Sequence, residues 1–114
     1  EIMNIVHPKD VPIAETPHKV DVRKLFDNEH VQVVQITLKP GEALKKHITP
    51  VDVTFYVLDG RGIVEIGEEK EEVGPHTLIE SPKKIPHTWY NESDADCTFL
   101  VIKTPRPENV TRML

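Results

Sequence analysis

The feature that most constrains this chain is a series of short apolar runs separated by turn residues. The clearest run is VTFYVL at residues 53–58, because β-branched and aromatic side chains suit a pleated, buried surface. The pair Pro40-Gly41 precedes this run, and Asp59-Gly60-Arg61-Gly62 follows it. Both combinations are typical of tight turns. The run therefore predicts a buried β-strand that ends in a hairpin.

Other segments repeat this pattern along the chain, and none shows the apolar spacing of an amphipathic helix over roughly 11 residues. Turns at intervals of about 8–12 residues are typical of antiparallel sandwiches and barrels. We therefore predict an all-β antiparallel barrel, and for residues 108–114 a short helical turn or a frayed end. Strands are expected at residues 20–26, 30–38, 44–49, 53–58, 63–66, 71–73, 76–80, 85–91 and 98–103.

Length and charge limit the partners of this chain. Its 114 residues, 38% apolar and 29% charged, suffice for one domain with a single core. Asp and Glu outnumber Lys and Arg by 19 to 14, which gives no basic footprint for nucleic acid or an anionic membrane. No apolar stretch approaches the ~20 residues of a membrane span, and no charged start precedes an apolar run. We therefore expect a cytoplasmic protein without nucleic-acid or membrane partners.

Two further features have ordinary structural interpretations. The single cysteine, Cys97, lies in the apolar run CTFLVIK, so we expect a small buried hydrophobe rather than a catalytic thiol. The acidic run at residues 68–72 is expected to form a solvated hairpin tip. A cation site would need a loop of regularly spaced oxygen ligands.

One motif around the central strand resembles the first motif of the cupin family. Gly41 is followed after five residues by His47, and Gly60 ends the FYVLDG run. Thr49 stands where cupins place a second histidine, and Val53 stands where they place a glutamate. Two of the family's usual metal ligands are therefore missing.

A second motif, PKKIPHTWYN at residues 82–91, resembles the second cupin motif. Pro82, His87 and Asn91 match that pattern, whereas Lys84 replaces its glycine. The two motifs follow each other in the right order and at the right separation. The resemblance therefore implies an antiparallel double-stranded β-helix, the jelly-roll or cupin barrel.

The resemblance also implies how one domain is divided along the chain. The cupin barrel would span residues 31–105, after an extended arm with edge strands at 1–30 and before a C-terminal tail at 106–114. The arm up to Pro17 carries short apolar pairs between prolines but is too short to build its own core. Small cupins commonly pair through sheet edges that would otherwise be exposed. We therefore expect a homodimer.

In cupins the motif histidines point into the barrel and bind a divalent transition metal. The resemblance thus makes His47 and His87 candidate ligands of one Zn, Mn, Fe or Ni ion, bound weakly or not at all because ligands are missing. Strand alternation turns Asp52 to the opposite face from position 53, so it would replace the glutamate only if a bulge intervened. Alternation from these positions gives a ligand pocket lined by His47, Thr49, Val53, Phe55, His87 and Trp89.

The remaining ring side chains are interpreted separately. His7, His18, His30 and His76 are expected to be exposed or structural. Trp89 is expected either in the core or at the barrel mouth, where an aromatic ring stacks flat or sugar-like ligands.

Three functions fit this pattern. The first is a cupin that binds a small molecule at a degenerate metal site. The second is a metal-dependent enzyme, of dioxygenase or isomerase type, in which His47 and His87 act with a third ligand. The third is a metal-free enzyme that uses a neutral histidine as general base, as sugar epimerases of the same fold do. The pattern assigns no residue a catalytic role beyond these histidines.

Overall fold

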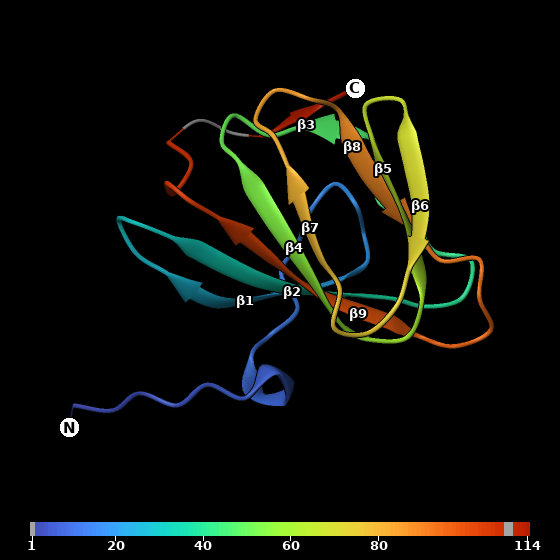
Figure 1. Ribbon diagram of the computed structural model, residues 1–114. Helices are drawn as coiled ribbons and strands as arrows, with labels where there is room; N and C mark the ends of the chain where they lie inside the picture. Colours follow the sequence, from blue (N-terminus) through green and yellow to red (C-terminus); the bar gives the residue numbers. More distant parts are fainter. Residues whose placement is uncertain (1, 109–110) are drawn as a thin grey trace.

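The computed structural model describes residues 2–108 and 111–114 and shows an all-β fold (Figure 1). Apart from strands, this part of the chain forms the short 3-10 turn η1 (Pro8–Asp10). None of its helices is long and apolar enough to cross a membrane. The strands are β1 (Asp21–Asp27), β2 (Gln32–Leu38), β3 (His47–Ile48), β4 (Val53–Asp59), β5 (Gly62–Ile66), β6 (Glu69–Val73), β7 (Leu78–Ser81), β8 (His87–Tyr90), β9 (Cys97–Lys103) and β10 (Arg112–Met113).

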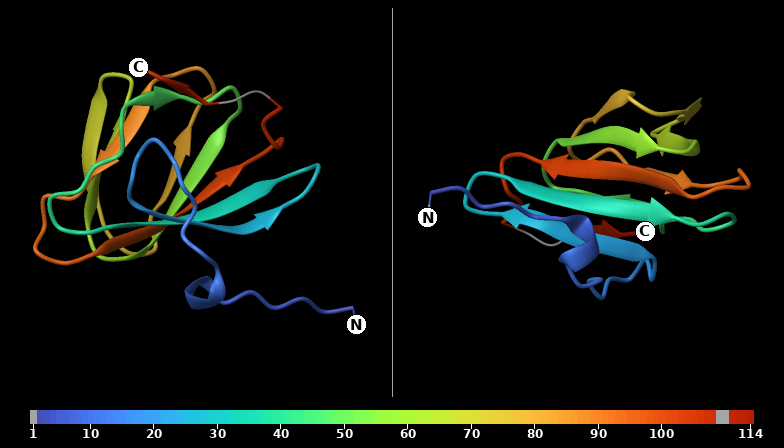
Figure 2. Two further views of the ribbon diagram at one scale, coloured as in Figure 1. Left: turned by 180° about the vertical axis from the view of Figure 1, so that it is seen from behind. Right: turned by 90° about the horizontal axis from the view of Figure 1, so that it is seen from below.

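The strands form two sheets that face each other. One sheet has the order β1-β2-β9-β4-β7, and the other has the order β10-β3-β8-β5-β6. Neighbouring strands pair antiparallel in both sheets. Figure 2 shows β1, β2, β9 and β4 side by side in the view from below. The predicted double-stranded β-helix is therefore confirmed.

Strand alternation decides which residues enter the space between the sheets. Because successive side chains point to opposite faces, the alternating apolar residues of one strand share the core. In β9 these are Cys97, Phe99 and Val101, each at most 5% exposed. Strand β4 contributes Val53, Phe55 and Val57 in the same way, and β2 contributes Val34, Ile36 and Leu38. Cys97 is buried, as the sequence predicts, and burial raises the pKa of its thiol to about 11.

The C-terminal segment departs from the prediction. Arg112 pairs with Ile48 and Met113 with His47, so the chain ends in the edge strand β10. A helical turn or a frayed end is therefore the wrong prediction for the described residues of 108–114, and residues 109 and 110 lie outside the described part. The reason is that the edge of β3 offers unpaired backbone groups, which an extended segment satisfies. The strand expected at 44–49 is correspondingly short, since only β3 is regular.

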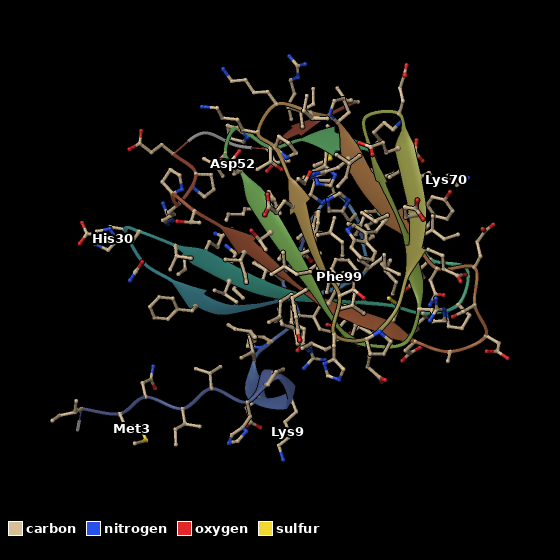
Figure 3. The ribbon with its side chains drawn as sticks, viewed as in Figure 1. Met3, Lys9, His30, Asp52, Lys70 and Phe99 are labelled. Carbon is tan, nitrogen blue, oxygen red and sulfur yellow. The ribbon has the colours of Figure 1, made fainter. Side chains whose placement is uncertain are left out.

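The N-terminal arm lies outside the barrel. Figure 3 shows Met3 and Lys9 on a segment that extends away from both sheets. The guanidinium group of Arg23 holds the end of η1 by donating hydrogen bonds to the carbonyl oxygens of Pro8 and Val11, at 2.9 and 3.3 Å. The same group pairs with Asp21 at 2.8 Å. Ile2, Met3 and Ile5 remain exposed.

Candidate functional site

Two histidines meet inside the barrel where β3 and β8 pair. His47 opens β3, His87 opens β8, and the register places them directly opposite each other. Their Nε2 atoms lie 2.9 Å apart, and their rings meet edge to face with centroids 4.4 Å apart. The side chains are 7% and 2% exposed, respectively. The structure therefore brings together the two histidines that the motifs single out.

The pair belongs to a directional chain of hydrogen bonds. The carbonyl oxygen of Lys45 accepts from Nδ1 of His47 at 2.6 Å, so this network assigns the His47 proton to Nδ1. Nε2 of His47 then accepts from Nε2–H of His87, and the hydroxyl of Ser81 donates to Nδ1 of His87 at 2.6 Å. The Thr49 hydroxyl lies 3.3 Å from Nε2 of His87 as a weaker second acceptor. Both imidazoles are therefore neutral members of one satisfied network.

Burial keeps these rings uncharged. Desolvation is the main cause that lowers the pKa of His87 to about 3, and electrostatic interactions with His47, Lys103 and His18 lower it as well. Desolvation also lowers the pKa of His47, although the hydrogen bond to Lys45 opposes this effect. The site therefore offers neutral nitrogen donors and acceptors at pH 7.

A cavity of about 170 Å³ lies beside the histidine pair. It opens between β1, β2, β9 and the segment before β1. A larger hollow of about 450 Å³ beside residues 13–21 has no histidine in its lining, so it has no comparable chemistry. The cavity at the pair is lined by Thr16, Pro17, His18, Val22, Lys24, Gln32, Val34, Ile36, Leu44, His47, Phe55, His87, Val101, Lys103 and Thr111.

Only some of the predicted pocket residues line the cavity. His47, Phe55 and His87 line the cavity. Thr49 reaches it only through its contact with His87. Val53 and Trp89 point inward, as alternation requires, but they are fully packed at 2% and 0% exposure and do not line the cavity. Strand alternation predicts which residues point inward, but not how far along the barrel each of them lies. The pocket predicted from alternation therefore includes residues of the packed core.

The packed position of Trp89 has a clear cause. Its ring stacks on Phe99 with centroids 4.1 Å apart and planes inclined by 15°, and it also meets Phe55 edge to face. The first of the two expected positions, the core, is therefore the one that Trp89 occupies. No ligand platform is formed at this ring.

Several polar residues at the cavity lie outside the two motifs, among them His18 and Lys103. His18 lies in the segment before β1, and its ring lies 4.8 Å from that of His47. Its Nδ1 accepts a hydrogen bond from the backbone N–H of Lys45, which is a structural role, and its pKa is lowered to about 4, chiefly by burial. Lys103 is the last residue of β9 and also lines the cavity. The other three histidines, His7, His30 and His76, are exposed, as the sequence predicts.

The donors at the pair do not make a complete metal site. Among residues 2–108 and 111–114, no three His, Cys, Asp or Glu side chains are placed to hold an ion. Near the pair, the Thr49 hydroxyl is neutral and a poor ligand beside imidazole. The His18 ring is also near, but its Nδ1 already accepts the Lys45 N–H. The idea that Asp52 replaces the missing glutamate is wrong. Its exposed carboxylate accepts the Lys83 N–H at 2.8 Å, and the bulge in β4 lies beyond Val57, far from residue 52.

These features define a double-stranded β-helix with two motif histidines facing one cavity. The family model described as the cupin domain matches residues 34–103. The chain belongs to the cupin family. The resemblance seen in the two motifs is thereby confirmed.

Relatives of this cupin include proteins with and without a named activity. The protein TT1209 from Thermus thermophilus is 31% identical, with a TM-score of 0.79 over 92% of this chain and 100% of TT1209. The polyketide cyclase RemF from Streptomyces resistomycificus is 25% identical, with a TM-score of 0.84 over 99% of this chain and 86% of RemF. The uncharacterized protein MJ0764 from Methanocaldococcus jannaschii is 27% identical over a 94-residue alignment, with 78% of each chain covered.

Proposed function

We propose that this cupin binds a small molecule in the cavity beside His47 and His87. One observation carries the proposal: a satisfied network of neutral imidazoles forms part of the wall of a cavity of about 170 Å³ whose remaining wall is largely apolar. A mainly apolar cavity with a few convergent polar groups is the usual form of a small-molecule site. A ligand acceptor would compete for Nε2–H of His87, and a ligand donor would compete for Nε2 of His47.

The proposal is tested by filling the cavity. Val34 lines it, whereas its neighbour Val33 lies on the other face of β2. We expect backbone amide signals around the cavity to shift when ring-sized organic compounds are titrated into the wild-type protein. Val34→Phe should abolish these shifts, and the control Val33→Phe should retain them. Shifts that survive unchanged in Val34→Phe would place the binding site elsewhere.

A second candidate is a metal-free enzyme in which the pair transfers a proton. The chain Ser81–His87–His47–Lys45 is continuous, and one relative, at 25% identity, is named a polyketide cyclase. However, a general base works best with a pKa near the working pH, and the pKa of His87 is lowered to about 3. Binding therefore ranks above catalysis for the unliganded site. Proton exchange into a bound carbon acid, followed by NMR in heavy water, would separate the two candidates.

The homodimer is also a proposal. The arm exposes Ile2, Met3 and Ile5 to solvent at 67% or more, and contact with a second subunit would bury these side chains. Sedimentation at micromolar concentration should show a dimer that Ile5→Glu weakens. A monomeric wild-type protein would contradict this assembly.

A further inference from the structure

The cavity has a one-sided charge that contrasts with the whole chain. The chain carries a net charge of −5, yet none of the described residues that line the cavity is acidic. Its cationic lining residues are Lys24 and Lys103, and the three histidines that line it are neutral. The cavity is therefore a cationic site within an acidic protein.

Lys103 is the central cation of this site. It lies on the inward face of β9, two residues beyond Val101, and it pairs in register with Gln32 of β2, which also lines the cavity. Its charge contributes to the lowered pKa values of His18, His47 and His87. Lys103 therefore lines the same cavity as all three rings.

This ammonium group differs from the cations that form the barrel's ion pairs. Arg23 pairs with Asp21 at 2.8 Å, and Lys46 pairs with Glu65 at 3.3 Å. Within the described part of the chain, the partly buried Lys103 has neither an ion-pair nor a side-chain hydrogen-bond partner. Desolvation and the charge of Lys24 both lower its pKa. A cation that is removed from water without a partner is unfavourable, and an anion in the cavity would supply that partner.

The rest of the wall is suited to an apolar body. Val22, Val34, Ile36, Phe55 and Val101 line the cavity together with Leu44. The volume of about 170 Å³ is close to the roughly 150 Å³ at which an apolar protein cavity holds benzene. The ligand that matches both walls is therefore about the size of one six-membered ring and carries one negative charge.

We propose that the cavity binds a small organic carboxylate, with its apolar body against the valine and phenylalanine wall and its carboxylate paired with Lys103. This inference rests on the small-molecule function proposed above and names the ligand class. Lys24 adds a second cation to this side of the site, and the neutral His18 ring borders it. Nε2–H of His87 is available as a neutral donor to the same carboxylate if the bond to His47 opens.

The test uses three probes of nearly equal size and different charge: benzoate, benzamide and benzylamine. Binding is measured by calorimetry and by amide shifts in wild type and Lys103→Met. The control Lys83→Met removes an exposed lysine in the loop between β7 and β8, and Lys103→Arg keeps the charge in the cavity. Because Lys103 holds no partner in the described structure, methionine removes no internal pair, and an unchanged amide spectrum verifies the fold.

We expect wild type to bind benzoate at least about tenfold more tightly than the other probes, since a hydrogen bond between charged groups is stronger than one between neutral groups. Lys103→Met should lose this preference, while Lys103→Arg and Lys83→Met should keep it. Equal binding of all three probes, or unchanged benzoate binding in Lys103→Met, would overturn the carboxylate proposal and leave the small-molecule function standing. Failure of all three probes to bind would overturn both.

Discussion

The same strands form two ends of the barrel interior that differ in packing. The aromatic end, formed by Leu38, Trp89, Cys97 and Phe99, is wholly buried, with each residue at 0% exposure. The cavity end, formed by His18, His47, His87 and Lys103, borders open volume. Phe55 lies between the two ends, with its ring 5.3 Å from those of both His87 and Trp89.

The difference between the two ends shows that a candidate ligand site needs only a few residues from each strand. Strand β8 supplies His87 to the cavity end and Trp89, two residues later, to the aromatic end. Strand β9 supplies Phe99 to the aromatic end and Lys103, four residues later, to the cavity end. Figure 3 shows Phe99 between the two sheets, at the level where they pack together. The aromatic end positions the strands, so the cavity end can carry polar groups that contribute less to stability.

The largest expected effect would come from opening the aromatic end. Phe99→Ala removes a ring that packs between Trp89 and Phe55, and large-to-small core substitutions of this kind typically lower the free energy of unfolding by about 3–5 kcal/mol. Urea unfolding measures the loss. The control Leu100→Ala changes the neighbouring, partly exposed residue of β9 and should cost much less. Equal losses would show that the aromatic end is not the main source of stability.

The second-largest effect is expected from acid, which should lower the stability of the fold through the histidines of the cavity end. The pKa values of His87 and His18 fall from 6.5 to about 3 and about 4 on folding, so between pH 6.5 and those values the unfolded chain binds more protons than the folded one. Stability is therefore complete above pH 6.5 and declines as the pH falls through this window. Thermal melts from pH 7 to pH 4 should show a falling Tm.

His87→Gln should reduce the fall of the Tm with decreasing pH, because one buried neutral ring is removed. The matched control, His30→Gln, changes an exposed ring in the β1–β2 turn and should reproduce the wild-type slope. If His87→Gln keeps the full slope, the decline arises from other groups.

A smaller effect is expected from Ser81→Ala. The substitution leaves Nδ1 of the buried His87 without its donor, which lies at 2.6 Å in wild type. An unsatisfied buried polar atom costs about 1–3 kcal/mol. Ser81→Cys retains a weak donor. Its free energy of unfolding, measured with urea, should therefore lie between those of wild type and Ser81→Ala. A fully stable Ser81→Ala would show that water or another tautomer satisfies the ring.

The smallest effect concerns metal. With two imidazoles and no carboxylate at the pair, Zn or Mn should raise the Tm of wild type by little, because tight transition-metal binding needs further strong ligands. Thr49→His with Val53→Glu restores the ligands that the family motif has and should make the Tm metal-dependent through mass action. A wild type stabilised as strongly as this variant would reveal a complete native site.

The fold could be predicted from the sequence because alternation and turn chemistry are local. The shared pocket of His47 and His87 can be predicted from the motifs. The run CTFLVIK also places Lys103 in phase with Phe99, which indicates that Lys103 points inward. His18 had no such signal, since it reaches the cavity from a loop whose course depends on tertiary contacts. The two-residue strand β10 likewise depends on the free edge of β3, which no local pattern encodes.

The division of the barrel interior into an aromatic end and a cavity end that binds the ligand is tested most directly by side-chain nitrogen NMR during a benzoate titration. In the free protein, the spectrum should show His47 protonated at Nδ1 and His87 at Nε2, as the hydrogen bonds require. On titration, the imidazole signals of His18, His47 and His87 should shift while the indole N–H of Trp89 stays in place. Imidazoles that do not respond, or an indole signal that moves as far as they do, would contradict the account.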